Sequence, residues 1–142
     1  MFALIDKKAL VTGASGGIGG AIARTLHAQG ATVGLAGRNQ ASLNALSVEL
    51  GERSHVIVAD LADSDATDTM LAAADEAMSG VDILVNNAGL TLDNLAMRLK
   101  DDDWQRVLDV NLTASFRLSR AVLRGMMKSK WGRIINITSI VG

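Results

Sequence analysis

Five short apolar runs, rich in β-branched residues, alternate with longer segments of helical periodicity along the whole chain. The runs lie at 9–12, 32–36, 55–58, 83–86 and 133–137. Each is almost continuously apolar, which is typical of parallel strands covered on both faces. Between the runs, apolar residues recur four positions apart, as at Ile18, Ile22 and Leu26. This alternation predicts one α/β domain over residues 1–142, built from βαβ units with right-handed crossovers around a doubly wound parallel sheet.

Composition narrows the classes of protein that the chain can belong to. A net charge of −1 gives no electrostatic reason to bind nucleic acid or an anionic membrane. The absence of cysteine excludes disulfides and thiolate metal sites, and the two histidines form no cluster, so we expect no metal. No apolar run approaches the ~18 residues of a membrane span, and residues 1–8 do not resemble a signal peptide. We therefore expect a soluble, cytoplasmic protein.

A glycine-rich segment, Thr12 to Gly19, directly follows the first apolar run and opens the first predicted helix. Glycine lets the backbone turn sharply and brings its N–H groups against a phosphate, and the positive end of the helix favours the negative charge. Between a strand and an amphipathic helix, such a turn predicts a site for the pyrophosphate of a dinucleotide. The residues expected to contact the nucleotide here are Gly13, Ser15, Gly17, Ile18 and Gly19.

A long helix is predicted from about Asn111 to Lys130. Its apolar residues cover roughly two-thirds of the circumference, whereas a helix that packs on a sheet alone needs an apolar stripe of about 100°. The excess predicts a second buried face against another subunit, and hence a dimer or a tetramer. The polar remainder is a stripe of Arg117, Arg120 and Arg124, which a solvated helix face would also explain.

The glycines of the turn are spaced Gly-x-x-x-Gly-x-Gly and preceded by a threonine, and four further motifs follow in order. These are Asp60-Leu61 after the third run, Asn86-Asn87-Ala88-Gly89 at the end of the fourth, Asn111 at the start of the predicted long helix, and Ser139 after the fifth run. With these motifs the chain resembles the short-chain dehydrogenase/reductase family. The resemblance implies a Rossmann-like sheet with strand order 3-2-1-4-5 that lacks the last strands of the family.

The resemblance also assigns roles to individual residues. It implies that Asp60, Leu61, Asn87, Ala88 and Gly89 contact the nucleotide together with the glycine turn. In the family, a serine at the position of Ser139 orients the substrate carbonyl, and an asparagine at that of Asn111 supports a water in a proton relay. A tyrosine and a lysine complete this tetrad. The sequence contains no tyrosine, and the family's position for it lies beyond Gly142, so we expect the 142 residues alone to be inactive.

The end of the second run indicates which cofactor is preferred. Dinucleotide-binding domains that use NAD usually place an acidic residue there, to hold the ribose 2′-hydroxyl. This chain has Arg38 after Gly37 instead. Without a carboxylate a 2′-phosphate is not repelled, and an arginine can bind it through two charge-assisted hydrogen bonds. The sequence therefore predicts NADP(H).

Segments 93–98, 124–128 and 132–137 narrow the resemblance to the family members that reduce 3-oxoacyl thioesters on acyl carrier protein in fatty-acid biosynthesis. The product implied is the (3R)-3-hydroxyacyl thioester. We expect a basic cluster near the mouth of the site to steer the acidic carrier, although a solvated helix end would account for it equally well. The cluster comprises Arg124, Lys128, Lys130 and Arg133. Two other functions stay open: another short-chain ketone or alcohol oxidoreductase, and a nucleotide-binding module without catalysis.

Overall fold

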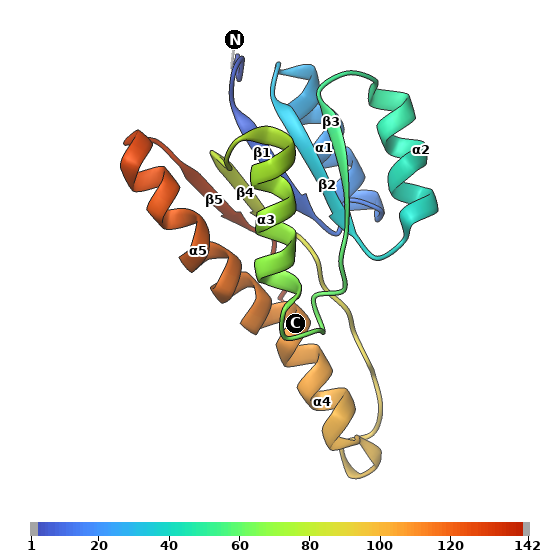
Figure 1. Ribbon diagram of the computed structural model, residues 1–142. Helices are drawn as coiled ribbons and strands as arrows, with labels where there is room; N and C mark the ends of the chain where they lie inside the picture. Colours follow the sequence, from blue (N-terminus) through green and yellow to red (C-terminus); the bar gives the residue numbers. More distant parts are fainter. Residues whose placement is uncertain (1–2, 141–142) are drawn as a thin grey trace.

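The strands of the domain run parallel in the order β3-β2-β1-β4-β5, and helices lie on both faces of the sheet (Figure 1). The computed structural model describes residues 3–140, so residues 1, 2, 141 and 142 of the predicted domain lie outside the described part. The prediction of a doubly wound, Rossmann-like parallel sheet is confirmed. The elements are β1 (Lys8–Thr12), α1 (Gly17–Ala28), β2 (Thr32–Gly37), α2 (Gln40–Leu50), β3 (Ser54–Val58), α3 (Ala66–Met78), β4 (Ile83–Asn86), η1 (Ala96–Arg98), α4 (Asp101–Leu108), η2 (Asp109–Thr113), α5 (Ala114–Ser129) and β5 (Arg133–Asn136).

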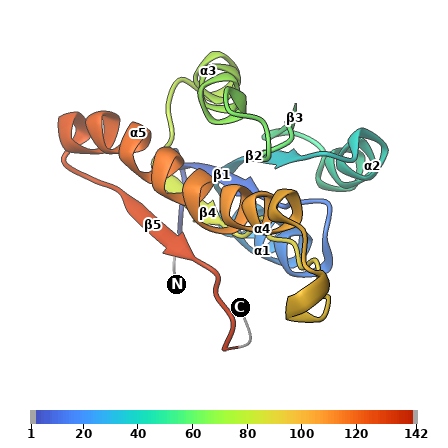
Figure 2. The same cartoon turned by 90° about the horizontal axis from the view of Figure 1, so that it is seen from below.

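Alternate residues of each central strand belong to two separate cores. In β1, Leu10 packs in the core formed with α3 and α5, which includes Met70 and Leu118. Its neighbours Ala9 and Val11 belong to the core formed with α1 and α2. Figure 2, seen from below, shows α3 on one side of the sheet and α1 on the other. The continuous apolar character of the strand therefore reflects burial on both faces.

Residues with positive φ lie at the ends of α2 and α3. Gly51 follows α2 with φ of 75°. At the end of α3 the left-handed cap is Ser79, with φ of 61°, and Gly80 follows with φ of 126°. The two consecutive positive φ angles reverse the chain toward β4, so the serine is held in a conformation that glycine adopts more easily.

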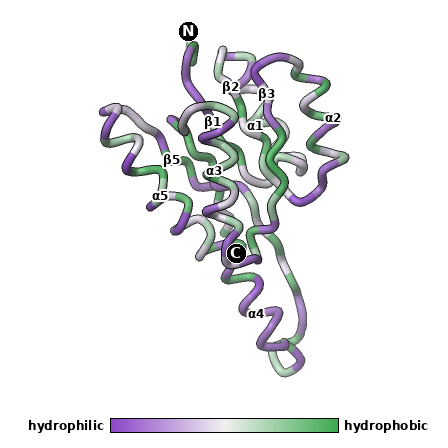
Figure 3. Tube along the Cα trace, viewed as in Figure 1, coloured by the Kyte–Doolittle hydropathy of each residue, from purple (hydrophilic) through white to green (hydrophobic). Residues whose placement is uncertain are grey.

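The predicted start of the long helix is wrong. The helix begins ten residues earlier, at Asp101, and runs through α4, the π-helical segment η2 and α5 to Ser129. Three aspartates occupy its first turn, where their negative charges interact favourably with the positive end of the helix dipole. None of residues 101–108 is fully buried, and the trace of α4 is largely purple in Figure 3. Its few apolar residues, Trp104, Val107 and Leu108, do recur at helical spacing, but the segment is short and mostly polar.

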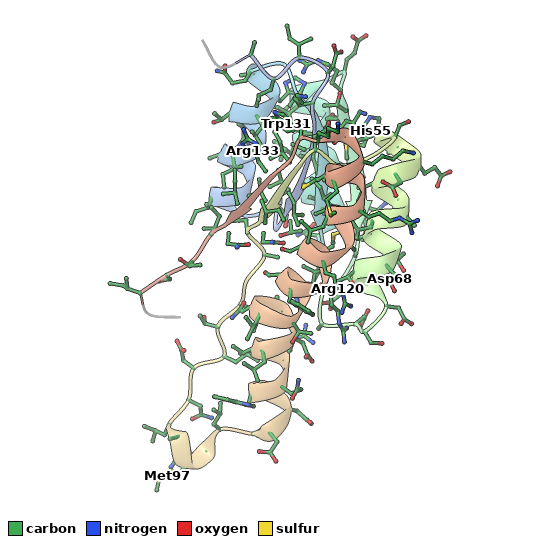
Figure 4. All side chains as sticks on the ribbon, turned by 90° about the vertical axis from the view of Figure 1, so that its left-hand side faces the viewer. His55, Asp68, Met97, Arg120, Trp131 and Arg133 are labelled. Carbon is green, nitrogen blue, oxygen red and sulfur yellow. The ribbon has the colours of Figure 1, made fainter. Side chains whose placement is uncertain are left out.

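The α4 helix and η1 form a lobe that extends beyond the body of the domain (Figure 1). Figure 4 shows Met97 at the tip of this lobe and Trp131 and Arg133 at the other end of the molecule. There the Trp131 ring contacts two cations, Lys7 Nζ at 4.1 Å from the ring centroid and the Arg133 guanidinium at 4.8 Å. These contacts tie the start of β5 to the start of β1. No helix within residues 3–140 is long and apolar enough to cross a membrane.

Candidate nucleotide-binding cleft

The turn between β1 and α1 brings the helix unusually close to the strand. Gly13 has φ of 63°, and its carbonyl accepts a hydrogen bond from Gly16 N at 3.1 Å. A Cβ on Gly19 would overlap the carbonyl oxygen of Gly13 and would lie 2.6 Å from Nδ2 of Asn87. The first turn of α1 can therefore approach β1 only because residue 19 is glycine.

The N-terminus of α1 is open to a ligand. Its N-cap is Gly16, which offers no side chain to cap the helix, and no acidic residue lies in the first turn. A Cβ built on Gly17 would meet no described atom within 4 Å. The positive end of α1 therefore has no side-chain cap and no acidic neighbour, and open space lies beside Gly17. These are the features of a helix end that can bind phosphate groups.

Thr12 joins the glycine turn to the segment that follows β4. Its buried Oγ1 donates to the carbonyl of Val85 at 3.3 Å and accepts from the backbone N–H groups of Asn87 and Ala88, at 3.0 and 2.9 Å. The Asn87 amide returns hydrogen bonds to the carbonyls of Thr12 and Gly13. The Asn87–Gly89 segment is therefore fixed against the turn by a hydroxyl whose role the sequence motif does not reveal.

Arg38 and Asp60 lie at the ends of β2 and β3, on the same edge of the sheet as the glycine turn. Asp60 Oδ1 accepts from Ala62 N at 3.0 Å, and Oδ2 lies 3.5 Å from a guanidinium nitrogen of Arg106. Arg38 is exposed and belongs to no ion pair among the described residues. Its charge is therefore available to an anionic group in the cleft.

These elements enclose one cleft of about 350 Å³, within the range usual for ligand sites. All the residues predicted to contact the nucleotide line it: Gly13, Ser15, Gly17, Ile18, Gly19, Arg38, Asp60, Leu61, Asn87, Ala88 and Gly89. The sequence motifs are therefore brought together in space. Thr12, Met70, Leu90 and Val110 also line the cleft and were not predicted.

The two predicted catalytic residues lie outside this lining. Asn111 belongs to η2 and not to a helix start, and its side chain makes two hydrogen bonds with the backbone of Leu90, at 2.9 and 2.8 Å. A Cβ on Gly89 would lie 3.1 Å from Oδ1 of Asn111, so the glycine permits this close approach. Ser139 follows the end of β5 and is exposed. The structure thus attaches Asn111 to the edge of the cleft, while Ser139 lies on the segment beyond the sheet.

A second polar residue that the motifs leave unexplained is the buried Asn86, the last residue of β4. Its Nδ2 donates to Ser119 Oγ on α5 at 3.1 Å and to Oδ1 of Asn136 on β5 at 2.8 Å. Its Oδ1 has no hydrogen-bond partner among the described residues. Asn86 therefore joins β4, β5 and α5 just before the chain enters the cleft.

The predicted position of the basic cluster is wrong for this chain's own cleft. Arg133 pairs with Ile83 at the beginning of β4, and Lys128 and Lys130 lie at the end of α5. The helix runs antiparallel to the strands, so its end lies at the edge of the sheet opposite the glycine turn (Figure 4). Within residues 3–140, no group of three or more His, Cys, Asp or Glu residues is placed to hold a metal ion.

The fold defines the chain as an α/β domain of the Rossmann-like class, with a cleft at the carboxyl edge of its sheet. A family model described as short chain dehydrogenase matches residues 7–142, and the chain belongs to the short-chain dehydrogenase family, whose members are oxidoreductases that use nicotinamide cofactors.

Individual relatives are similar to the chain over all or almost all of its length. It is 56% identical over 142 residues to Nodulation protein G of Rhizobium sp. (strain N33), covering 100% of this chain and 58% of the relative. It is 48% identical over 139 residues to the 3-oxoacyl-[acyl-carrier-protein] reductase FabG of Vibrio harveyi, covering 98% and 57%. It is 46% identical over 142 residues to the FabG of Rickettsia conorii, an alignment that covers 100% of this chain and 57% of the relative. The chain thus spans somewhat more than half the length of these relatives.

Proposed function

We propose that the protein carrying this chain is an NADPH-dependent reductase that converts a 3-oxoacyl thioester on acyl carrier protein into the (3R)-3-hydroxyacyl thioester. The observation that carries the proposal is the single cleft in which the glycine turn, Arg38, Asp60 and Asn87 meet. The identity to the two reductases named FabG supports the substrate class. Fatty-acid biosynthesis in the cytoplasm is the setting that this substrate implies.

Each part of the cleft suits one part of the dinucleotide. The N–H groups at the start of α1 would hold the diphosphate, and Arg38 would hold the 2′-phosphate. Asp60 and Leu61 would bind the adenine, and Asn87 to Gly89 would lie beside the nicotinamide half. When bound, the reduced nicotinamide supplies the hydride. Discrimination against NADH rests on Arg38, because it can pair with a 2′-phosphate where NAD-binding domains use a carboxylate.

The remaining chemistry is proton transfer to the carbonyl oxygen. The hydroxyl of Ser139 would donate a hydrogen bond to this oxygen and orient it, and Asn111 would support a water in the relay. Because the sequence contains no tyrosine, the family's proton donor is not among these 142 residues. We therefore expect turnover from the natural protein that carries the chain and none from residues 1–142 alone.

The exposed side of the helix formed by α4, η2 and α5 supports an assembly of identical subunits. Leu118, Val122 and Met126 of α5 are buried against the sheet. Apolar side chains on the other side of the helix are exposed in the single chain: Leu112, Phe116, Leu123 and Met127. A face of this kind on a soluble domain marks an interaction site, and we propose a homodimer or homotetramer through it.

The cofactor proposal is tested by Arg38→Asp in the natural protein. We expect the ratio of kcat/KM for NADPH to that for NADH to fall by about 10- to 100-fold. This factor corresponds to the loss of one hydrogen bond to a charged group. The assay follows NADPH oxidation with an acetoacetyl thioester. Lys128→Asp makes the same change in charge at the opposite edge of the sheet and should leave the ratio unchanged. An unchanged ratio in Arg38→Asp would overturn the cofactor assignment.

The same assay separates the proposed reaction from its alternatives. Ser139→Ala should reduce kcat strongly while NADPH still binds. A natural protein that binds NADPH but reduces no ketone would support a nucleotide-binding module. One that reduces simple ketones and no acyl thioester would support another short-chain oxidoreductase.

A further inference from the structure

Two arginines of the helix formed by α4, η2 and α5 contact the loop between β3 and α3. Arg106 of α4 lies 3.5 Å from Oδ2 of Asp60, and Arg117 of α5 donates to the carbonyl oxygen of Ser64 at 3.1 Å. The first contact is at the beginning of the loop and the second near its end. One helix therefore fixes both ends of the segment that carries Asp60 and Leu61 into the cleft.

The carboxylate of Asp60 is held from two sides. Oδ1 accepts from Ala62 N within its own loop, and Oδ2 is turned toward Arg106. Each carboxylate oxygen can accept two hydrogen bonds, so both contacts leave acceptor capacity for a donor in the cleft. An exocyclic amino group of a base is such a donor. The arrangement therefore orients the carboxylate and leaves it able to accept a hydrogen bond from a ligand.

Packing does not explain the Arg106 contact. Both side chains are partly exposed, 40% for Arg106 and 34% for Asp60, and none of residues 101–108 is fully buried. An ion pair this exposed contributes little to folding stability. Its position beside a cleft proposed to hold several phosphates gives it another effect, because the guanidinium offsets a negative charge that would repel such a ligand.

We propose that Arg106 is a positioning residue for the adenosine half of the nucleotide: it fixes the Asp60 carboxylate toward the base and offsets its charge. This inference rests on the proposed function, because it needs a nucleotide in the cleft. It adds α4, an element outside the glycine-turn motifs, to the determinants of nucleotide affinity.

The test is calorimetric binding of 2′,5′-ADP, which carries the adenosine half alone, to the natural protein at low salt. Arg106→Ala should weaken binding by about 2- to 5-fold, the range of an exposed ion pair, and Arg106→Lys should restore part of the loss. In an Asp60→Asn background, Arg106→Ala should have almost no further effect. In the reductase assay, the single variant Arg106→Ala should raise KM for NADPH and leave kcat unchanged.

Arg24→Ala provides the matched control. It removes another exposed arginine–carboxylate pair, Arg24 with Glu49 at 2.7 Å, which lies outside the lining of the cleft. The affinity for 2′,5′-ADP should not change in this variant. Unaltered affinity in Arg106→Ala, or an equal loss in the Asp60→Asn background, would overturn the inference while leaving the proposed function intact. A wild-type protein that binds neither 2′,5′-ADP nor NADPH would overturn the proposed function itself.

Discussion

β1 and β5 are similar in sequence and different in environment. Both are short runs rich in branched apolar residues, but Ala9, Leu10 and Val11 of β1 are completely buried. β1 lies between β2 and β4 with helices on both faces. β5 forms the edge of the sheet and packs Ile134 toward α5, while Ile135 and the following Ile137 are 43% and 39% exposed. In residues 3–140, one face of β5 is uncovered.

This difference separates the two halves of the proposed site. The glycine turn follows β1, so a fully packed strand fixes it in place, and every predicted nucleotide contact reaches one cleft. Ser139 follows β5, whose packing is incomplete, and lies outside the lining. An apolar run therefore predicts that a strand forms, whereas the cover on its faces decides how firmly the strand positions a functional group.

The largest expected effect comes from truncating one residue in each strand. Leu10→Ala should lower the free energy of unfolding of the natural protein by about 2–5 kcal/mol, because it leaves a cavity in the core. Ile135→Ala should cost about 1 kcal/mol or less, because its side chain is already half exposed. Urea denaturation monitored by circular dichroism measures both. Equal losses would show that β5 is covered on both faces in the natural protein, and the comparison would fail.

The next effect concerns the exposed face of α5. Phe116 is 59% exposed in the single chain, and Phe116→Glu would place a charge in the proposed subunit contact. We expect the dissociation constant of the assembly to rise by at least about 30-fold, as for a residue at the centre of an interface. Phe116→Leu is the conservative control. Sedimentation velocity reports the change, and a wild-type protein that is monomeric at all concentrations would contradict the proposed assembly.

The strands were predictable because parallel strands leave a strong local signal, and their order was implied by the family resemblance. The predicted runs match β1 to β5 to within one residue at each end. The glycine turn and Arg38 were predicted from their places after the first and second strands, and the contacts at 60–61 and 87–89 were implied by the family resemblance. Sheet geometry explains why they meet. In a doubly wound sheet the strand ends meet at one edge, so residues that follow β1, β2, β3 and β4 must lie close together.

The rest of the site depends on weak local signals and on tertiary contacts. In α4, Trp104, Val107 and Leu108 recur at helical spacing, but the segment is short and mostly polar, so the predicted helix began too late. The π-helical segment that holds Asn111 depends on the local hydrogen-bond pattern of the backbone. Arg106 lies 46 residues from Asp60 in the sequence, and only the tertiary fold brings the pair together.

The start of α1 is proposed to bind the diphosphate of the nucleotide, and Gly17→Ala would place a methyl group at that position. The added methyl group would meet no described atom within 4 Å, and alanine favours a helix, so the free energy of unfolding should stay constant or rise by up to about 1 kcal/mol. Gly125→Ala, at a helix position equally free of neighbours but outside the cleft, is the matched control.

The measurement is the dissociation constant of NADPH for the wild-type protein and the two variants, obtained by isothermal titration calorimetry. We expect Gly17→Ala to weaken binding by at least about tenfold, because the methyl group displaces the phosphate from the charge-assisted hydrogen bonds of the turn. Gly125→Ala should bind as the wild type does. Equal affinities in all three proteins would show that the diphosphate binds elsewhere.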